Sequence, residues 1–243
     1  MKRVQGGRNF YGVALGIILL ETRFPRIPGD VGNASTFSFP VRYKVMKGVT
    51  VRRILQGQDP RVAEELIQAA RELEAEGVKA ITTSGGYLAL YQSVLARSVR
   101  VPVFTSSLLQ VPMVHRMLGE NSRIGILTTN SEALTDQHLK AVGVDESIPI
   151  AIEGLQGGEE YSRVIVTDSD SVDVERAEND VLSSARTLLS KHPDVEAIVV
   201  EGANFAPYSR VVQDLTGLPV FDLVTLCNYV YYSTVQRGYH GFM

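Results

Sequence analysis

The chain has 243 residues, of which 44% are hydrophobic and 21% charged, so it can bury a substantial core as one large domain or two small ones. Its net charge is −3 and like charges do not cluster, which argues against a nucleic-acid or membrane surface. A single cysteine excludes an internal disulfide, and together with four scattered histidines it lacks the spacing of a metal site.

The apolar run Val13–Leu20 is typical of a strand buried on both faces. It is too short to span a bilayer, and no small-residue cleavage site follows it. We therefore expect a cytoplasmic protein that does not contact a membrane.

The first half of the chain continues with a helix that begins at Asp59-Pro60 and ends at Gly77. Aspartate is a good N-cap, proline fits the first helical position, and glycine commonly ends a helix. The next predicted elements are the strand Lys79–Thr83, a helix over 87–96, the strand Val101–Phe104 and a helix over 108–118.

The second half repeats this alternation. Strands are predicted at Arg123–Leu127, Ala197–Val200 and Leu218–Phe221. Helices are predicted over 131–142 and 174–189, a further helix after the strand that ends at Val200, and a final helix that runs toward Arg237. Residues 153–173 are polar and irregular, so we expect a loop or short elements at an edge. The alternation predicts an α/β fold with mainly parallel sheets.

An internal repeat relates two of these segments. Residues 78–107 align with 195–224 at a shift of 117 without a gap, and ten of the thirty positions are identical. A shorter echo pairs 16–19 with 125–128, and chance alone could explain it. The repeat predicts two Rossmann-like α/β lobes related by a pseudo-twofold, the first made of residues 1–117 plus 218–243 and the second of residues 118–217.

Each repeat contains a strand, a glycine and a predicted helix, with Gly85 and Gly202 at equivalent positions. Ligands of open α/β sheets bind at the carboxyl ends of strands, and helix N-termini favour anions. The two glycines could therefore face one another across a cleft that binds an anion. Alternatively, each glycine only turns a strand into a helix.

Several stretches resemble the aspartate/glutamate/hydantoin racemase superfamily, in order and over most of the chain. They are ILLETRFPRIPGDVGNASTF, TTSGG followed by YLALYQ, VPVFTSSLLQVP, VVEGANFAPYS and TGLPVFDLVTL. The resemblance implies two similar lobes with the active site between them, chemistry without a cofactor, and a homodimer.

In that family two cysteines exchange a proton on opposite faces of the carbon next to a carboxylate. The corners of relatives read like TTSCG and LECTN, whereas this chain has TTSGG and VEGAN, so Gly85 and Gly202 occupy both cysteine positions. Two-thiol racemisation is therefore impossible. Cys227 matches Gln110 in the repeat, lies well past the corner, and is expected to be a packed core thiol.

Three explanations of the glycines stay open: a natural branch with other chemistry, an engineered isomerase without its thiols, or a binding protein. Arylmalonate decarboxylases of the same superfamily have glycine at the first position and cysteine at the second, so one loss is compatible with a changed reaction. The expected ligand is an amino acid, a hydantoin or a substituted malonate. An enzyme would act through carbanion or enediolate character, as a decarboxylase or lyase if the chain is natural. The alternative is a protein that binds a small carboxylate without turnover.

The resemblance also indicates which residues contact the ligand. At the first corner these are Thr83, Ser84, Gly86 and Tyr87, whose hydroxyl and amide groups could hold a carboxylate or an oxyanion. For Thr83 and Ser84, simple capping of the next helix is the competing interpretation.

The loop after the first strand supplies Glu21, which corresponds to an acid in relatives, and the two arginines Arg23 and Arg26. A guanidinium suits a carboxylate ligand, although a solvated loop charge is the competing interpretation.

The second lobe contributes Thr128, Thr129 and Asn130, which resemble the family's carboxylate donors, although Asn130 could simply cap a helix. At the second corner the candidates are Glu201, Ala203 and Asn204. Glu201 could act as a base if burial raises its pKa, or it could be a structural hydrogen-bonding group.

Overall fold

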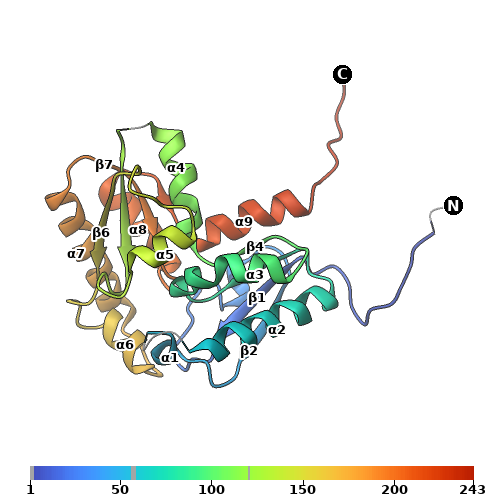
Figure 1. The fold of residues 1–243 in the computed structure, drawn as a ribbon. Coiled ribbons are helices and arrows are strands. Elements are labelled where there is room, and N and C mark those ends of the chain that lie inside the picture. The colour runs from blue at the N-terminus through green and yellow to red at the C-terminus, as the bar shows by residue number, and fades with distance from the viewer. Residues whose placement is uncertain (1–2, 56–58, 120) are drawn as a thin grey trace.

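The computed structural model describes residues 3–55, 59–119 and 121–243. It contains two four-stranded sheets, with strand orders β2-β1-β3-β4 and β6-β5-β7-β8, and all paired strands are parallel. Each sheet forms one lobe with its helices, and the two lobes lie against one another (Figure 1). The predicted two-lobe α/β fold is confirmed.

The strands of the first sheet are β1 (Leu15–Leu20), β2 (Val41–Met46), β3 (Ala80–Thr83) and β4 (Val103–Phe104). The helical segments that precede the second sheet are η1 (Ala34–Thr36), α1 (Val51–Leu55), α2 (Pro60–Glu76), η2 (Gly86–Tyr91), α3 (Gln92–Ser98), η3 (Ser107–Gln110) and α4 (Val111–Leu118), where η denotes a 3-10 helix.

The strands of the second sheet are β5 (Arg123–Thr128), β6 (Ile150–Gly154), β7 (Val195–Val200) and β8 (Val220–Phe221). The remaining helical segments are α5 (Asp136–Ala141), α6 (Tyr161–Thr167), α7 (Val174–Lys191), η4 (Ala206–Tyr208), α8 (Ser209–Thr216) and α9 (Leu223–Thr234).

The internal repeat corresponds to equivalent strands of the two sheets. Ile81 of β3 pairs with Gly16 of β1, and Ile198 of β7 pairs with Gly125 of β5. Even the short echo of 16–19 in 125–128 therefore has a structural basis. A Cβ on Gly16 would lie 3.0 Å from Leu73 of α2, and one on Gly125 would lie 2.6 Å from Leu188 of α7. Both glycines thus let a long helix pack closely on its sheet.

The predicted boundaries of α2 are confirmed. The Asp59 side chain accepts a hydrogen bond from the Arg61 N–H, and Gly77 ends the helix with a left-handed φ of 99°. α5 instead begins five residues later than predicted. The side chain of Asn130 accepts the N–H groups of Glu132 and Ala133, which closes a turn before the helix.

Two further features differ from the expectation. β2 and α1 were not predicted, because β2 is an edge strand with a mixed burial pattern and α1 is only five residues long. Residues 153–173 contain the end of the edge strand β6 and the whole of the seven-residue α6, in agreement with the expected short elements at an edge. β8 pairs with β7, so the boundary expected at residue 218 does not follow the sheets, although α9 packs on the first lobe. There Cys227 is fully buried, which confirms a core thiol.

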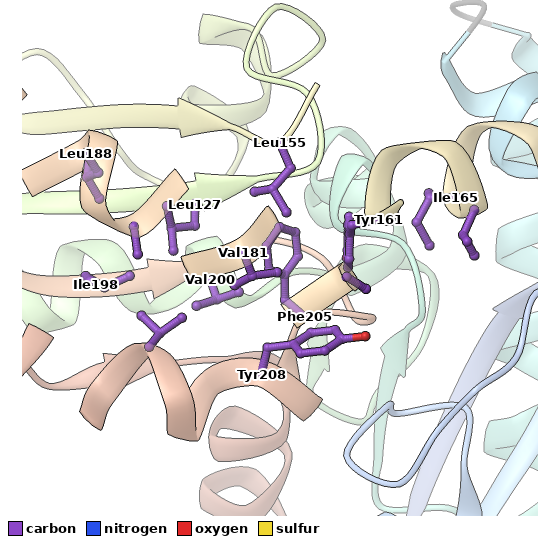
Figure 2. Close-up of a cluster of buried hydrophobic side chains, with 14 of the residues drawn as sticks. Leu127, Leu155, Tyr161, Ile165, Val181, Leu188, Ile198, Val200, Phe205 and Tyr208 are labelled. Carbon is purple, nitrogen blue, oxygen red and sulfur yellow. The ribbon is translucent and has the colours of Figure 1, made fainter. Parts of the chain in front are cut away.

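The core of the second lobe reaches the interlobe region through three aromatic side chains. Figure 2 shows Tyr161 of α6 beside Phe205 and Tyr208, which follow β7. The ring centroids of Tyr161 and Phe205 are 4.7 Å apart. This packing fixes α6 and the segment after Gly202, both of which border the candidate site.

Candidate active site

A hollow lies where the carboxyl ends of β1, β3, β5 and β7 approach one another across the two lobes. Its empty volume, including the open mouth, is about 450 Å³. The apolar side chains that line it are Leu20, Phe24, Val51, Ile54, Ile165 and Ala203. The polar side chains are Thr22, Arg26, Ser84, Tyr87, Thr129 and Asn204. Gly85 and Gly86 complete the lining.

The first corner presents its backbone to this hollow. Gly85 is the N-cap of η2, and the first N–H groups of such a helix have no acceptor within the helix. Ser84 Oγ accepts the N–H of Leu20 at 3.0 Å, so the hydroxyl proton of Ser84 can be donated toward the hollow. This corner therefore offers hydrogen-bond donors to an anion.

The second corner meets the first one directly. A Cβ on Gly86 would lie 3.0 Å from the backbone nitrogen of Gly202. Gly202 is followed by a turn, and the 3-10 helix η4 begins only at Ala206. The expectation that a helix starts directly after Gly202 is therefore wrong, although its neighbours Ala203 and Asn204 do line the hollow.

The two glycines at the family's cysteine positions differ in conformation. Gly85 has a φ of −131°, which any residue adopts, and a Cβ there would meet the Leu20 methyl at 3.1 Å. Gly202 has a φ of +113°, and a Cβ there would meet the Phe205 ring at 3.2 Å. Residues with a side chain rarely adopt that φ. The backbone at position 202 thus favours glycine, whereas the backbone at position 85 suits any residue and a Cβ there needs only a small shift of the Leu20 methyl group.

Glu201 directly follows β7 and its carboxyl group is buried between the lobes, with 1% of the residue exposed. Thr128 Oγ1 donates to Oε2 at 2.5 Å, while Oε1 has no hydrogen-bond partner among the described residues. A Cβ on Gly86 would lie 1.4 Å from that oxygen. Burial raises the pKa of Glu201 to about 7, against the smaller lowering effect of the Thr128 hydrogen bond.

Tyr87 connects the hollow to this carboxyl group. Its hydroxyl lies 3.5 Å from Thr128 Oγ1, donates to the Asn130 carbonyl at 3.2 Å and accepts the Asn130 N–H at 3.1 Å. Burial, and then the nearby Glu201 charge, raise the pKa of Tyr87, so the phenol stays neutral.

The guanidinium of Arg26 is held in place from two sides. It donates to Asp30 Oδ1 at 2.9 Å and to Thr22 Oγ1 at 3.0 Å, and it lies 5.0 Å from the ring centroid of Phe24. The side chain of Asn204 donates to the other oxygen of Asp30 at 2.5 Å. This chain of contacts joins the lobes and holds the Arg26 guanidinium at the hollow.

The structure places several other predicted residues away from the hollow. Glu21 is exposed and accepts the N–H of Gly48 at 2.7 Å. Arg23 pairs at the surface with Asp170 at 3.4 Å. The side chains of Thr83, Thr128 and Asn130 are used in internal hydrogen bonds, to the Thr105 carbonyl, to Glu201 and to the backbone of a turn, respectively.

Other residues of the site were missed by sequence reasoning. Asp30 is buried and orients Arg26, but nothing in the motif GDVGN marks it as a partner four residues away. Val51 and Ile54 come from the unpredicted helix α1, and Ile165 from the segment expected to be irregular. The alternation of apolar and charged residues in Val41–Met46 could have indicated the strand β2, and with it a connection through α1.

Within residues 3–55, 59–119 and 121–243, no cluster of His, Cys, Asp or Glu could hold a metal ion. No helix in the same residues is long and apolar enough to cross a membrane.

No family model matches the chain. Known structures do match it: arylmalonate decarboxylase aligns with a TM-score of 0.62 and 14% identity, covering 93% of this chain and 94% of that one. A Francisella tularensis glutamate racemase in complex with D-glutamate aligns with a TM-score of 0.57 and 14% identity, covering 91% and 80%. The chain has the fold of the aspartate/glutamate racemase superfamily.

Proteins that are similar to this chain in sequence are named as lyases. The chain is 29% identical over 239 residues to a dimethylsulfoniopropionate lyase of Durusdinium sp. clade D, covering 96% of this chain and 79% of that protein. It is 34% identical over 225 residues to dimethylsulfoniopropionate lyase 7 of Emiliania huxleyi, covering 88% of this chain. The chain spans 65% of that protein, slightly less than two thirds. The resemblance to the superfamily is confirmed, and the named relatives are lyases rather than isomerases.

Proposed function

We propose that this protein is a cofactor-independent lyase that removes a proton from the carbon next to the carboxylate of a small acid. The observation that carries the proposal is a hollow in which Arg26 and Ser84 can hold a carboxylate while glycines occupy both thiol positions. Racemisation needs an acid and a base on opposite faces of the carbon, whereas elimination needs a base on only one face. The site therefore fits elimination better than racemisation.

The relatives suggest the substrate. Dimethylsulfoniopropionate has a carboxylate at one end and a sulfonium cation at the other. In the hollow, the carboxylate would contact Arg26 and the first corner, and the sulfonium would lie among apolar and aromatic side chains that include Phe24 and Tyr87. Elimination would yield acrylate, dimethyl sulfide and a proton.

The test is to incubate the full chain with dimethylsulfoniopropionate and to quantify acrylate and dimethyl sulfide. Phenylmalonate, aspartate and a substituted hydantoin serve as competing substrates. We expect product from the sulfonium compound and no racemised amino acid. Phenylacetate from the malonate without any acrylate would instead assign a decarboxylase.

The second candidate is a protein that binds a small carboxylate without turnover, as a homodimer of the kind the family suggests. It is favoured by the absence of both thiols, since binding needs no proton acceptor. Calorimetry that detects saturable binding of dimethylsulfoniopropionate or acrylate, with no product after prolonged incubation, would select this function.

A further inference from the structure

Glycines at both cysteine positions leave the lyase without the family's proton acceptor. We propose that the Glu201 carboxylate takes this role and receives the proton from the substrate carbon next to the carboxylate. This inference rests on the proposed function. It assigns the catalytic base of the same site to a residue that directly precedes the second cysteine position.

The first argument is the position of the carboxyl group. Glu201 directly follows β7, on the side where β3 also ends, and its Oε1 atom lies against Gly86, which lines the hollow. Any side chain at position 86 would occupy the place of the Oε1 atom.

The second argument is the unused acceptor. Thr128 satisfies Oε2, but Oε1 is buried and has no partner among the described residues. A buried polar atom without a hydrogen-bond partner destabilises the folded protein, so its presence needs an explanation. A role purely in holding the lobes together would be served by a partner on both oxygens, whereas a base needs one oxygen free.

The third argument is the set of charges around the carboxyl group. Thr128 is neutral, and the titratable groups that face Glu201 are the phenols of Tyr87 from η2 and Tyr161 from α6. Burial keeps both phenols protonated. The nearest cation of the hollow, Arg26, is paired with Asp30. The carboxyl group therefore titrates in an uncharged surrounding, with a pKa near neutrality that suits a base.

The step balances as a β-elimination. The Glu201 carboxylate takes a proton from carbon 2 of the substrate, and the C–H electron pair forms the double bond to carbon 3. The bond from carbon 3 to sulfur breaks, and its electron pair leaves with dimethyl sulfide. Acrylate retains the original carboxylate charge, and Glu201 returns its proton to water before the next cycle.

The experiment follows elimination and hydrogen exchange at carbon 2 of dimethylsulfoniopropionate by proton NMR in D2O. It compares the wild type with Glu201→Gln, Thr128→Val and the matched control Glu196→Gln. Glu196 lies at the other, exposed end of β7 and accepts a hydrogen bond from Ser122, so it undergoes the same chemical change away from the hollow.

We expect Glu201→Gln to lower the rate by about 10²–10⁴-fold, the range for loss of a general base, and Glu196→Gln to leave it unchanged. The wild-type rate should rise with pH through about 7 and then level off. Thr128→Val removes a hydrogen bond that favours the ionised carboxylate, so its profile should move to higher pH. A residue with only a structural role would not move the profile in this way.

The outcomes separate this inference from the proposed function. If Glu201→Gln still eliminates at more than a tenth of the wild-type rate, Glu201 is not the base, but the proposed lyase function stands. If hydrogen at carbon 2 exchanges only when Glu201 is present and no acrylate forms, Glu201 is a base but the protein is not a lyase. Neither reaction in the wild type overturns both. Thermal melting of each variant at pH 8 shows whether it is folded.

Discussion

The Oε1 atom of Glu201 occupies the space where a side chain at position 86 would begin, 1.4 Å from the Cβ position of Gly86. One residue belongs to the second lobe and the other to the first. The fit between the lobes therefore depends on the missing side chain of Gly86 and on the buried carboxyl group that fills its place.

Gly86→Ala should be destabilising because the new methyl group and the carboxyl group cannot share one position. We expect the free energy of unfolding to fall by about 1–3 kcal/mol, as for other overpacked cores. Gly85→Ala is the matched control, since its Cβ meets only the flexible ends of leucine side chains, Leu20 first. Urea unfolding measures both changes, and equal stabilities of the two variants would contradict the predicted fit.

Restoring cysteines should have unequal effects at the two corners. Gly85→Cys should fold with nearly wild-type stability, whereas Gly202→Cys should lose about 1–3 kcal/mol because its φ of +113° is strained for a side chain. Denaturant midpoints of the two single variants test this difference. A Gly202→Cys protein as stable as the wild type would show that the backbone at this corner adapts readily to a side chain.

Stability should depend on pH through Glu201. Burial raises the pKa of the folded protein's Glu201 to about 7, above its ordinary value of 4.5. Below pH 4.5 both states hold the proton and the stability contribution is fully present. As the pH rises to 7 the unfolded state releases the proton first, so the free energy of unfolding falls by up to about 1.4 kcal/mol per pH unit.

Above pH 7 this contribution is lost, and Glu201 no longer changes the free energy of unfolding as the pH rises. Unfolding by urea between pH 5 and 8 measures the effect as the difference between the wild type and Glu201→Gln, whose side chain does not titrate. Parallel curves for the two proteins would mean that Glu201 is ionised throughout this range.

Arg26 should contribute to ligand affinity through its fixed guanidinium. We expect Arg26→Gln to weaken the binding of acrylate by about 10-fold or more, since hydrogen bonds to charged groups contribute ~1.5–3 kcal/mol. Arg23→Gln is the control, because Arg23 pairs with Asp170 at the surface. Calorimetry with both variants is the measurement, and similar affinities would place the carboxylate elsewhere.

The sequence was informative where a pattern is local or repeated. The alternating runs and the repeat predicted two parallel sheets, and the match of Ile81 with Ile198 identifies equivalent strands. The capping of α2 by Asp59 and Gly77 was also predictable, because both effects involve only neighbouring residues.

The sequence could not predict contacts between distant segments. Nothing local shows that Asn204 contacts Asp30, or that the Glu201 carboxyl group lies against Gly86. The two glycines at the cysteine positions look alike in sequence, yet only Gly202 has a positive φ. Such differences depend on the path of the backbone after each strand, which side-chain types do not specify.

The most direct test is a crystal structure of the Glu201→Gln variant with uncleaved dimethylsulfoniopropionate. The account predicts a ligand in the hollow, with its carboxylate bonded to Arg26 or Ser84. Carbon 2 should lie within about 4 Å of the side-chain amide that the substitution introduces at position 201, close to contact distance for reacting groups. An empty hollow at saturating ligand, or a ligand whose carbon 2 faces away from position 201, would contradict it.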